Sequence, residues 1–452
     1  MDRLGHNQER QVTRRALLSM AAVGGLLSAA CGAAGGSGAT EKSPIEGVKP
    51  TGTINWSFWA VSQEQADNQL AQVKAFNAQQ PDVKVEAIWV LSGDYRSKII
   101  SLISAGTPPE LTQVDAYDMS SFVSQNLIQR MDPYMKGDRS FKLDDFLPGA
   151  FLENHHVFKG AHYSVPNGPE SPRVLFYNKT KWKDAGLPLP NQLDEQGKWT
   201  WDAFVEHLTR VTQTVGANKN WGIAAQLGVD PGPHSWISSN NGKTMSDDLK
   251  TFVGDTKDTI DALQFQADLI HRHKVAPTPS DDLGTGDTFL SGRIAMKLDG
   301  AWAAAPLFTR PDIDYGIAPL PKSPKGIRKT VVKPNSQTIP TGVTGAKAAA
   351  AWELAKYITS PAFQKGLIDA GQNLTNRKDQ VDYFLKTSPI RDRKVFMDAY
   401  DKKEVVAIPL FPKWRDYNII VGEEMTKVRR GELNVQTALG SIKSRANDLL
   451  KS

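Results

Sequence analysis

The sequence predicts an α/β fold, because strand patterns and helix patterns alternate along its first part. Apolar and polar side chains alternate in the predicted strands, and apolar side chains recur at helical spacing in the segments between them. The strands are predicted at 53–59, 83–90 and 111–115, with helices at 64–80 and 94–105. This order predicts βαβ units and a parallel sheet. Such sheets bind ligands beyond the carboxyl ends of their strands, here near Trp59, Trp89 and Asp115.

In the rest of the chain, strand patterns and helix patterns alternate less regularly. Further strands are predicted at 174–177 and 294–298, and helices at 260–273 and 346–359. Near the C-terminus, apolar side chains from Val435 to Leu449 form one helical stripe, and Gly431 separates this helix from the one before it. There is no fixed-period repeat, which argues against a solenoid.

Composition narrows the class of protein. The chain has 452 residues, 40% hydrophobic and 23% charged, which is ordinary for a globular protein of two or three domains. The formal net charge is +5, of which +2 lies in the first thirty residues, and the remainder is too dispersed to indicate nucleic-acid binding. Cys31 is the only cysteine, so no internal disulfide is possible.

The N-terminal segment has the pattern of an export signal. Residues 11–31 place a basic stretch before a short apolar run that ends in small residues, as in a secretory signal. Thr13–Leu18 resembles a twin-arginine signal, and Leu27–Cys31 resembles a lipoprotein processing box in which Leu27 stands one place early. We therefore expect lipid attachment at Cys31, the alternative being an incidental buried thiol. The Gly- and Ser-rich residues 32–50 are expected to form a flexible tether.

Several segments of the body occur in the order found in a known family. They are residues 76–85, 94–95, 105–110, 163–166, 176–179, 185–188, 199–202, 289–302 and 317–321. Of these, 289–302 (FLSGRIAMKLDGAW) is the most specific. Together they resemble the carbohydrate class of extracellular solute-binding proteins of ABC importers, to which maltose-binding protein belongs.

The resemblance implies two doubly wound α/β lobes joined by a multi-strand hinge, the type II periplasmic-binding-protein fold. The N-lobe is then expected at 51–170 plus 331–385, and the C-lobe at 171–330 plus 386–452. It also implies an extracytoplasmic, monomeric protein without a cofactor, which captures a mono- or oligosaccharide for membrane permease subunits and is not an enzyme.

Sugars present apolar ring faces to aromatic side chains and hydroxyls to carboxylates and amides. The predicted ligand-binding residues are Trp59, Asp115, Glu170, Trp236, Asp299, Trp302, Asn335 and Trp414. The alternative for each tryptophan is a core position, and for each carboxylate a helix cap or a surface ion pair. By contrast, four tryptophans match framework positions and are predicted to be core, namely Trp182, Trp199, Trp201 and Trp352.

The expected site is divided between the lobes. Trp59, Asp115 and Glu170 are predicted on the N-lobe side, and Trp236, Trp302 and Trp414 on the C-lobe side. A ligand that touches both lobes then favours the closed form by its differential affinity.

Two other classes of function remain open, a cell-surface carbohydrate-active enzyme and the same fold binding a non-sugar solute. No nucleophile elbow, zinc motif or phosphate loop is present, and His271 and His273 point apart on a helix. Arginine and lysine motifs are scarce at the expected cleft, which favours sugars over anions.

The lipid anchor yields the first test. Intact-mass spectrometry of membrane extracts should find a mature chain that begins at a diacylated Cys31. Cys31→Ala should be exported but not anchored, because it lacks the thiol to which the lipid is attached. An unmodified membrane-bound chain that still carries residues 1–30 would contradict this prediction.

Overall fold

The computed structural model describes residues 43–60, 62–167, 171–215, 218–281, 283, 287–372 and 374–451. Residues 42–452 form one compact unit. The predicted lipid attachment at Cys31 and the predicted ligand contact at Glu170 lie outside the described residues.

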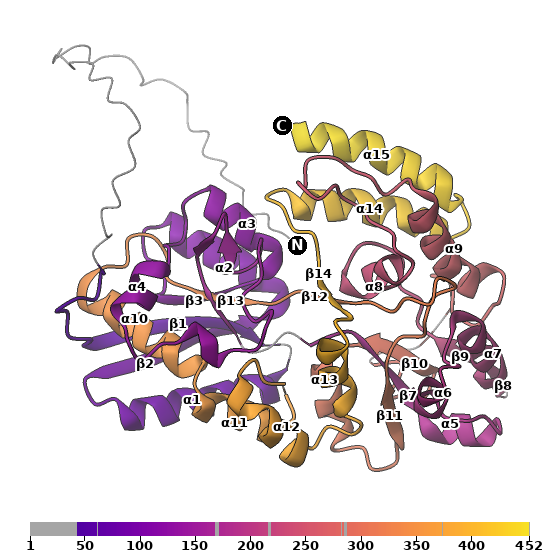
Figure 1. The fold of residues 1–452 in the computed structure, drawn as a ribbon, viewed down its shortest axis with the longest axis horizontal. Coiled ribbons are helices and arrows are strands. Elements are labelled where there is room, and N and C mark those ends of the chain that lie inside the picture. Colours follow the sequence, from indigo (N-terminus) through magenta and orange to yellow (C-terminus); the bar gives the residue numbers. More distant parts are fainter. Residues whose placement is uncertain are drawn as a thin grey trace, which may run out of the picture. The chain divides into compact units, whose positions relative to one another are not determined.

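The first of two five-stranded sheets has the order β2-β1-β3-β13-β6 and forms the N-lobe. Its strands are β1 (Gly52–Ala60), β2 (Val83–Leu91), β3 (Leu111–Val114), β13 (Ser336–Thr338) and β6 (Val165–Pro166). Its main helices are α1 (Gln63–Gln79), α2 (Ser92–Ser104), α3 (Ala116–Ser124), α4 (Asp132–Gly137), α10 (Gly345–Ile358) and α11 (Pro361–Asp369). Figure 1 shows α10 beside strands from much earlier in the chain, and Ala348, Trp352 and Ile358 share a buried cluster with β1. The indole N–H of Trp56 donates to Gln337 Oε1 at 2.9 Å and so joins β1 to β13.

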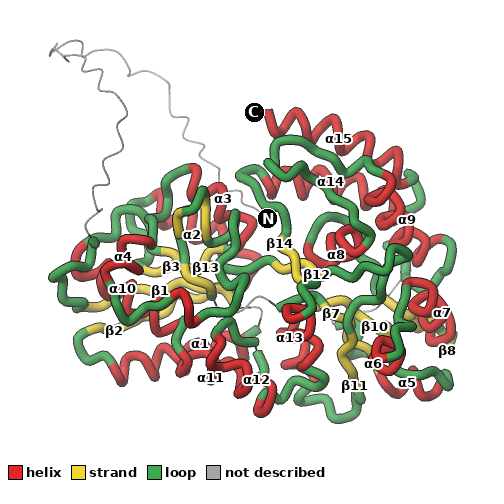
Figure 2. The backbone as a smooth tube through the Cα atoms, viewed as in Figure 1, coloured by secondary structure: helices red, strands yellow, loops and turns green. Residues whose placement is uncertain are grey.

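The second sheet has the order β11-β7-β10-β9-β8 and forms the C-lobe. Its strands are β11 (Tyr315–Ala318), β7 (Val174–Asn178), β10 (Ile294–Asp299), β9 (Asn218–Ile223) and β8 (Gln213–Val215). The accompanying helices are α5 (Lys179–Asp184), α6 (Pro190–Glu195), α7 (Trp201–Val211), α8 (Pro231–Ser239), α9 (Lys257–His271), α14 (Trp414–Arg429) and α15 (Val435–Lys451). Figure 2 shows both sets of strands with helices around them. A large buried cluster unites α7, α8, α9, α14 and α15 with β7 and β10.

Both sheets are mixed, whereas the sequence predicted a parallel sheet. β1 is parallel to β2 and β3, as expected for βαβ units. However, β13 runs antiparallel to β3 and β6, and β7 runs antiparallel to β10 and β11. β7 and β13 are the strands by which the chain enters a lobe after crossing from the other. No crossover helix sets their direction, and this accounts for the difference.

The chain crosses between lobes from β6 to β7, from β11 to β13, and again between α11 and α14. Between the lobes, β12 (Thr330–Val332) pairs in parallel with β14 (Val405–Ala407). The later segments α12 (Val381–Thr387) and α13 (Lys394–Asp401) contribute Phe384 and Phe396 to a cluster with β7, β11 and residues 301–307. The same cluster includes Ile368 of α11, so α12, which spans the predicted boundary at residue 385, lies where the two lobes meet. The fold class is confirmed as two α/β lobes joined by several chain crossings.

The remaining short elements are β4 (Val157–Phe158), β5 (Ala161–His162) and three 3-10 helices at 143–145, 301–307 and 378–380. Throughout the described part of the chain, no helix has the length and apolar character needed to span a membrane.

Candidate functional site

The lobes meet where β3 ends and α3 begins. Asp115 is the N-cap of α3, and its Oδ1 accepts from the backbone N–H of Tyr117 at 2.8 Å. The side-chain oxygen of Asn335, from the segment between β12 and β13, accepts from the N–H of Ala116 at 3.4 Å. The first turn of α3 is therefore fixed by side chains at the carboxyl end of a strand, the position expected for a ligand site in an α/β sheet.

Asp118, in that first turn, binds guanidinium groups from both lobes. Arg96 of α2 donates from Nε to Asp118 Oδ1 at 2.8 Å. Arg415 of α14 donates from Nε to Oδ1 at 2.5 Å and from an Nη to Oδ2 at 2.6 Å, which is a bidentate pair across the lobes. The side chain of Asp118 is only 5% exposed, whereas Arg415 is 37% exposed.

Asp115 also takes part in this charge cluster. Its Oδ2 lies 2.8 Å from Lys333 Nζ, and its Oδ1 lies 3.8 Å from an Nη of Arg415. Burial alone would raise the pKa of Asp115, but Lys333, the Tyr117 N–H and Arg415 hold this pKa below its usual value. Asp115 is therefore ionised at neutral pH and accepts hydrogen bonds.

Tyr117 extends from α3 onto the C-lobe. Its ring stacks on Trp414 with 5.9 Å between centroids and 23° between planes. Its hydroxyl donates to Asp230 Oδ1 at 2.6 Å, and Lys333 Nζ lies 4.4 Å from the centre of its ring. Burial, and then the charge of Asp230, raise the pKa of Tyr117, which keeps the phenol neutral as a donor. We use the term interlobe seam for Asp115, Tyr117 and Asp118 with Lys333, Asp230, Trp414 and Arg415.

A pocket of about 70 Å³ opens beside the seam. Trp59, Tyr95, Gln113, Asp115, Asp118 and Arg415 are among the residues that line it. Trp59 is half-buried and packs edge-on against Tyr95, with 5.2 Å between ring centroids. Drug-sized ligands occupy pockets of roughly 300–1,000 Å³, so this pocket by itself is too small for such a ligand.

Trp302 lies in a second part of the predicted site. Trp302 is half-buried. The guanidinium carbon of Arg173, the residue just before β7, lies 4.6 Å from the centre of its ring. A Cβ on Gly300 would come within 2.3 Å of the indole, so this glycine is needed for the observed position of Trp302. The neighbouring Asp299 accepts from the N–H of Gly300 at 2.8 Å, and its side chain is 30% exposed. Lys297 Nζ lies 3.7 Å from the other carboxylate oxygen of Asp299, so this side chain is paired with a cation while remaining accessible.

The structure places Trp236 in the core, which corrects its predicted position on the cleft surface. Trp236 is 3% exposed and packs against Trp201, Phe204 and Phe265. The local sequence of α8 is polar, but the helix turns this side chain towards the C-lobe cluster.

Trp414 is also completely buried, which corrects the expectation of an exposed face for ligand. Phe411 and Tyr417 pack against it within the C-lobe, and Tyr117 of the N-lobe covers it from across the seam. Its burial therefore depends in part on a residue of the other lobe.

Sequence reasoning missed Arg96 and five charged or phenolic groups of the seam, namely Tyr117, Asp118, Asp230, Lys333 and Arg415. The expectation that few cations lie at the cleft is wrong. Two local signals were present, since Tyr117 and Asp118 follow the predicted strand end at Asp115, and Arg415 follows Trp414. Nothing in the sequence indicated that these two segments meet.

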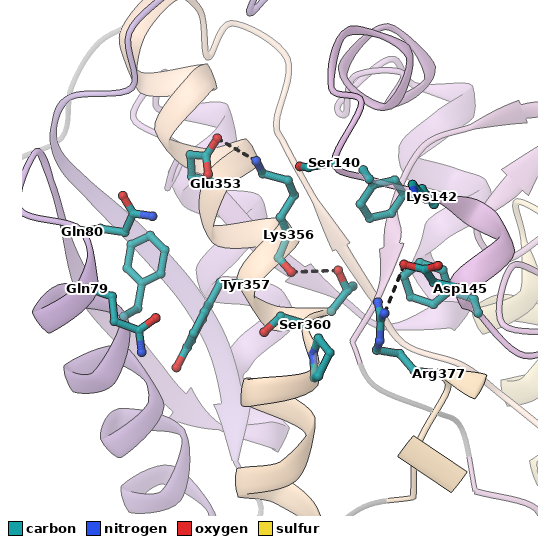
Figure 3. Close-up of a pocket in the computed structure, with 15 residues that line it drawn as sticks. Gln79, Gln80, Ser140, Lys142, Asp145, Glu353, Lys356, Tyr357, Ser360 and Arg377 are labelled. Carbon is teal, nitrogen blue, oxygen red and sulfur yellow. Dashed lines mark hydrogen bonds and ion pairs between the residues drawn. The ribbon is translucent and has the colours of Figure 1, made fainter. Parts of the chain in front are cut away.

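A larger hollow of about 320 Å³ lies on the N-lobe between α1, α10 and residues 140–146 (Figure 3). Most of its charged groups are paired, as Lys356 lies 2.9 Å from Glu353 and Arg377 lies 3.1 Å from Asp145. It belongs to a single lobe surface, so a ligand there would not couple to lobe closure. The described residues contain no cluster of three or more histidine, cysteine or acidic side chains that could hold a metal ion.

Two α/β lobes with polar and aromatic groups converging between them define a two-lobed ligand-binding protein. Residues 61–365 match the family model described as bacterial extracellular solute-binding protein. The chain belongs to this family.

Similar proteins are known in sequence and in structure. An arabinooligosaccharide-binding protein of Halalkalibacterium halodurans is 23% identical over 240 residues, 52% of this chain and 50% of that protein. An ABC substrate-binding protein of Listeria monocytogenes in complex with cycloalternan has a TM-score of 0.78 at 20% identity, covering 88% of this chain and 99% of that one. The GacH receptor of Streptomyces glaucescens, solved unliganded and with acarbose, has a TM-score of 0.73 at 20% identity, covering 89% and 99%. At these identities the structural matches establish the fold.

The assignment of Trp236 to the core can be tested by comparing its replacement with that of the half-buried Trp302. Trp236→Ala should lower the free energy of unfolding by about 3–5 kcal/mol, because it leaves a cavity among three aromatic rings. Denaturant unfolding followed by circular dichroism measures this loss. Trp302→Ala serves as the half-buried control and should cost clearly less; equal losses for both variants would contradict these placements.

Proposed function

We propose that the chain is the exported sugar-binding component of an ABC importer, anchored at the outer face of the membrane by a lipid on Cys31. It closes its two lobes around a mono- or oligosaccharide and catalyses no reaction. Family membership supports an extracellular binding role, and the relatives named above bind oligosaccharides or related compounds according to their names.

The observation that carries the proposal is the meeting of carboxylates and aromatic rings between the lobes. Asp115 and Asp230 present partly exposed oxygens that can accept from sugar hydroxyls, and Trp59 and Trp302 are half-buried indoles that can stack on a ring face. Asn335 holds the first turn of α3 in place. These groups come from both lobes, which is the arrangement needed for a ligand to favour closure.

A non-sugar solute is the second candidate, and the guanidinium groups at the seam are the observation that favours it. Arg96 and Arg415 could bind a carboxylate or phosphate if they released Asp118. Because these cations already pair with Asp118, an anionic ligand would have to replace a bidentate partner. A neutral polyhydroxylated ligand is therefore preferred.

A thermal-shift screen across sugars, peptides and anions tests the proposal. A ligand that binds only the native state at 100 times its Kd raises the free energy of unfolding by about 2.7 kcal/mol, so a sugar should raise the melting temperature. Trp302→Ala should weaken that binding by about 1–3 kcal/mol, since it removes an apolar stacking surface. Calorimetric titration measures the loss.

Three outcomes would overturn the proposal. One is stabilisation by peptides or anions without any by sugars. The second is conversion of an oligosaccharide to products by the pure protein, which would indicate an enzyme. The third is unchanged sugar affinity in Trp302→Ala, which would remove Trp302 from the site.

A further inference from the structure

Arg173 covers one face of the Trp302 indole. Its guanidinium carbon lies 4.6 Å from the centre of the ring, a position in which a guanidinium attracts the ring as a cation and stacks on it as a plane. Arg173 is only 8% exposed, and arginine is seldom buried to this extent without specific contacts. The contact with Trp302 is therefore part of the interior of the C-lobe and not a loose surface contact.

The backbone around Arg173 is bonded to the turn that carries Trp302. β7, which follows Arg173, pairs antiparallel with β10, the strand that leads into this turn. The N–H of Ala301 donates to the hydroxyl of Ser171 at 2.8 Å. The hydroxyl of Thr330, at the start of β12, donates to the carbonyl of Arg173 at 2.8 Å. Arg173 and Trp302 thus lie on segments that are fixed relative to each other.

Gly300 limits the Trp302 ring at its edge. A Cβ at this position would come within 2.3 Å of the six-membered part of the indole. The backbone of Gly300 is extended, with φ −97° and ψ 178°, a conformation that any residue adopts. The glycine is therefore needed for the position of the ring and not for the turn itself. Two neighbours define the position of this indole, one on its face and one at its edge.

Arg173 also lies close to the interlobe seam. Burial and the carboxylates of Asp230 and Asp115 raise the pKa of Tyr117, whereas the charge of Arg173 lowers it. The guanidinium is thus near enough to act on a residue of the N-lobe. Arg173 and the indole that it covers therefore lie on the side of the C-lobe that meets the N-lobe.

We propose that Arg173 is a positioning residue of the ligand site, which occupies one face of Trp302 and holds the indole so that its other face receives a single sugar ring. The identity of the ligand as a sugar rests on the proposed function above. A mobile indole would have to be ordered when the ligand binds, and ordering a side chain reduces affinity. Arg173 makes this ordering part of folding. Its place on the ring also excludes a second sugar ring from that face.

Arg173→Ala tests this role through the ring that Arg173 covers. The tryptophans are labelled with 5-fluorotryptophan, and the fluorine resonance that disappears in Trp302→Phe identifies Trp302. Without ligand, Arg173→Ala should shift or broaden this resonance. It should also weaken the binding of a sugar from the screen by roughly 2- to 12-fold, measured by calorimetric titration, because binding must then order the indole. Gly300→Ala should have the same two effects, since its methyl group displaces the ring while Arg173 remains.

Lys219→Ala is the matched control. Lys219 Nζ lies 3.8 Å from the ring centre of Trp221, a contact of the same kind in the same lobe but outside the seam. This variant should change the resonance of Trp221 and leave the sugar affinity unchanged. A double variant separates positioning from direct contact with the ligand. In a Trp302→Ala background, Arg173→Ala should weaken binding no further, because the ring through which Arg173 acts is gone.

The positioning role is overturned by any one of three results. They are an unchanged Trp302 resonance or sugar affinity in Arg173→Ala, an equal loss of affinity in Lys219→Ala, and a further loss caused by Arg173→Ala when Trp302 is absent. Circular dichroism identifies a variant that fails to fold, and Arg173→Met, which fills similar space without the charged plane, then replaces Arg173→Ala with the same expected results. If no sugar binds, the proposed function fails, whereas the fluorine resonance without ligand still tests whether Arg173 holds the ring.

Discussion

The carboxylate of Asp118 is bound by one guanidinium from each lobe, and the arrangement of the cleft depends on this sharing. A buried carboxylate needs a cation, since breaking a buried ion pair costs on the order of 3–5 kcal/mol. Arg96 meets that need within the N-lobe, so Asp118 would keep one guanidinium partner if Arg415 moved away. Arg415 can therefore act as a link between lobes that opens without leaving Asp118 unpaired.

The strength of the seam agrees with such a role. Arg415 is 37% exposed, and ion pairs at exposed positions contribute about 0.2–1 kcal/mol after solvent screening. An aromatic pair such as Tyr117 with Trp414 adds about 0.5–1.5 kcal/mol beyond its buried area. Together these contacts amount to roughly 1–2.5 kcal/mol, which is small enough for a ligand to overcome.

The elements of the fold could be predicted where periodicity was strong. The strand expected at 53–59 is found at Gly52–Ala60, and the helix expected at 346–359 is found at Gly345–Ile358. Trp182, Trp199, Trp201 and Trp352 were expected in the core and are 0–5% exposed. The antiparallel entries of β7 and β13 were not predicted, because strand direction depends on pairing between distant segments.

The site could be predicted only where it follows directly from a strand end, as at Trp59 and Asp115. Trp236 was misplaced because polar neighbours in the sequence do not show which way a helix turns its face. Trp414 is covered by a residue of the other lobe, and Asp118 and Arg415 are 297 positions apart in the chain. Contacts of this kind arise from tertiary structure, and no local pattern encodes them.

The central claim is that the seam and the ligand site are the same place. A crystal structure of the protein with a sugar from the binding screen tests it most directly. We predict a sugar between the lobes, with a ring face on Trp59 or Trp302 and ligand hydroxyls on Asp115 or Asp230. A sugar bound to one lobe alone, away from Asp115 and Asp230, would contradict the account.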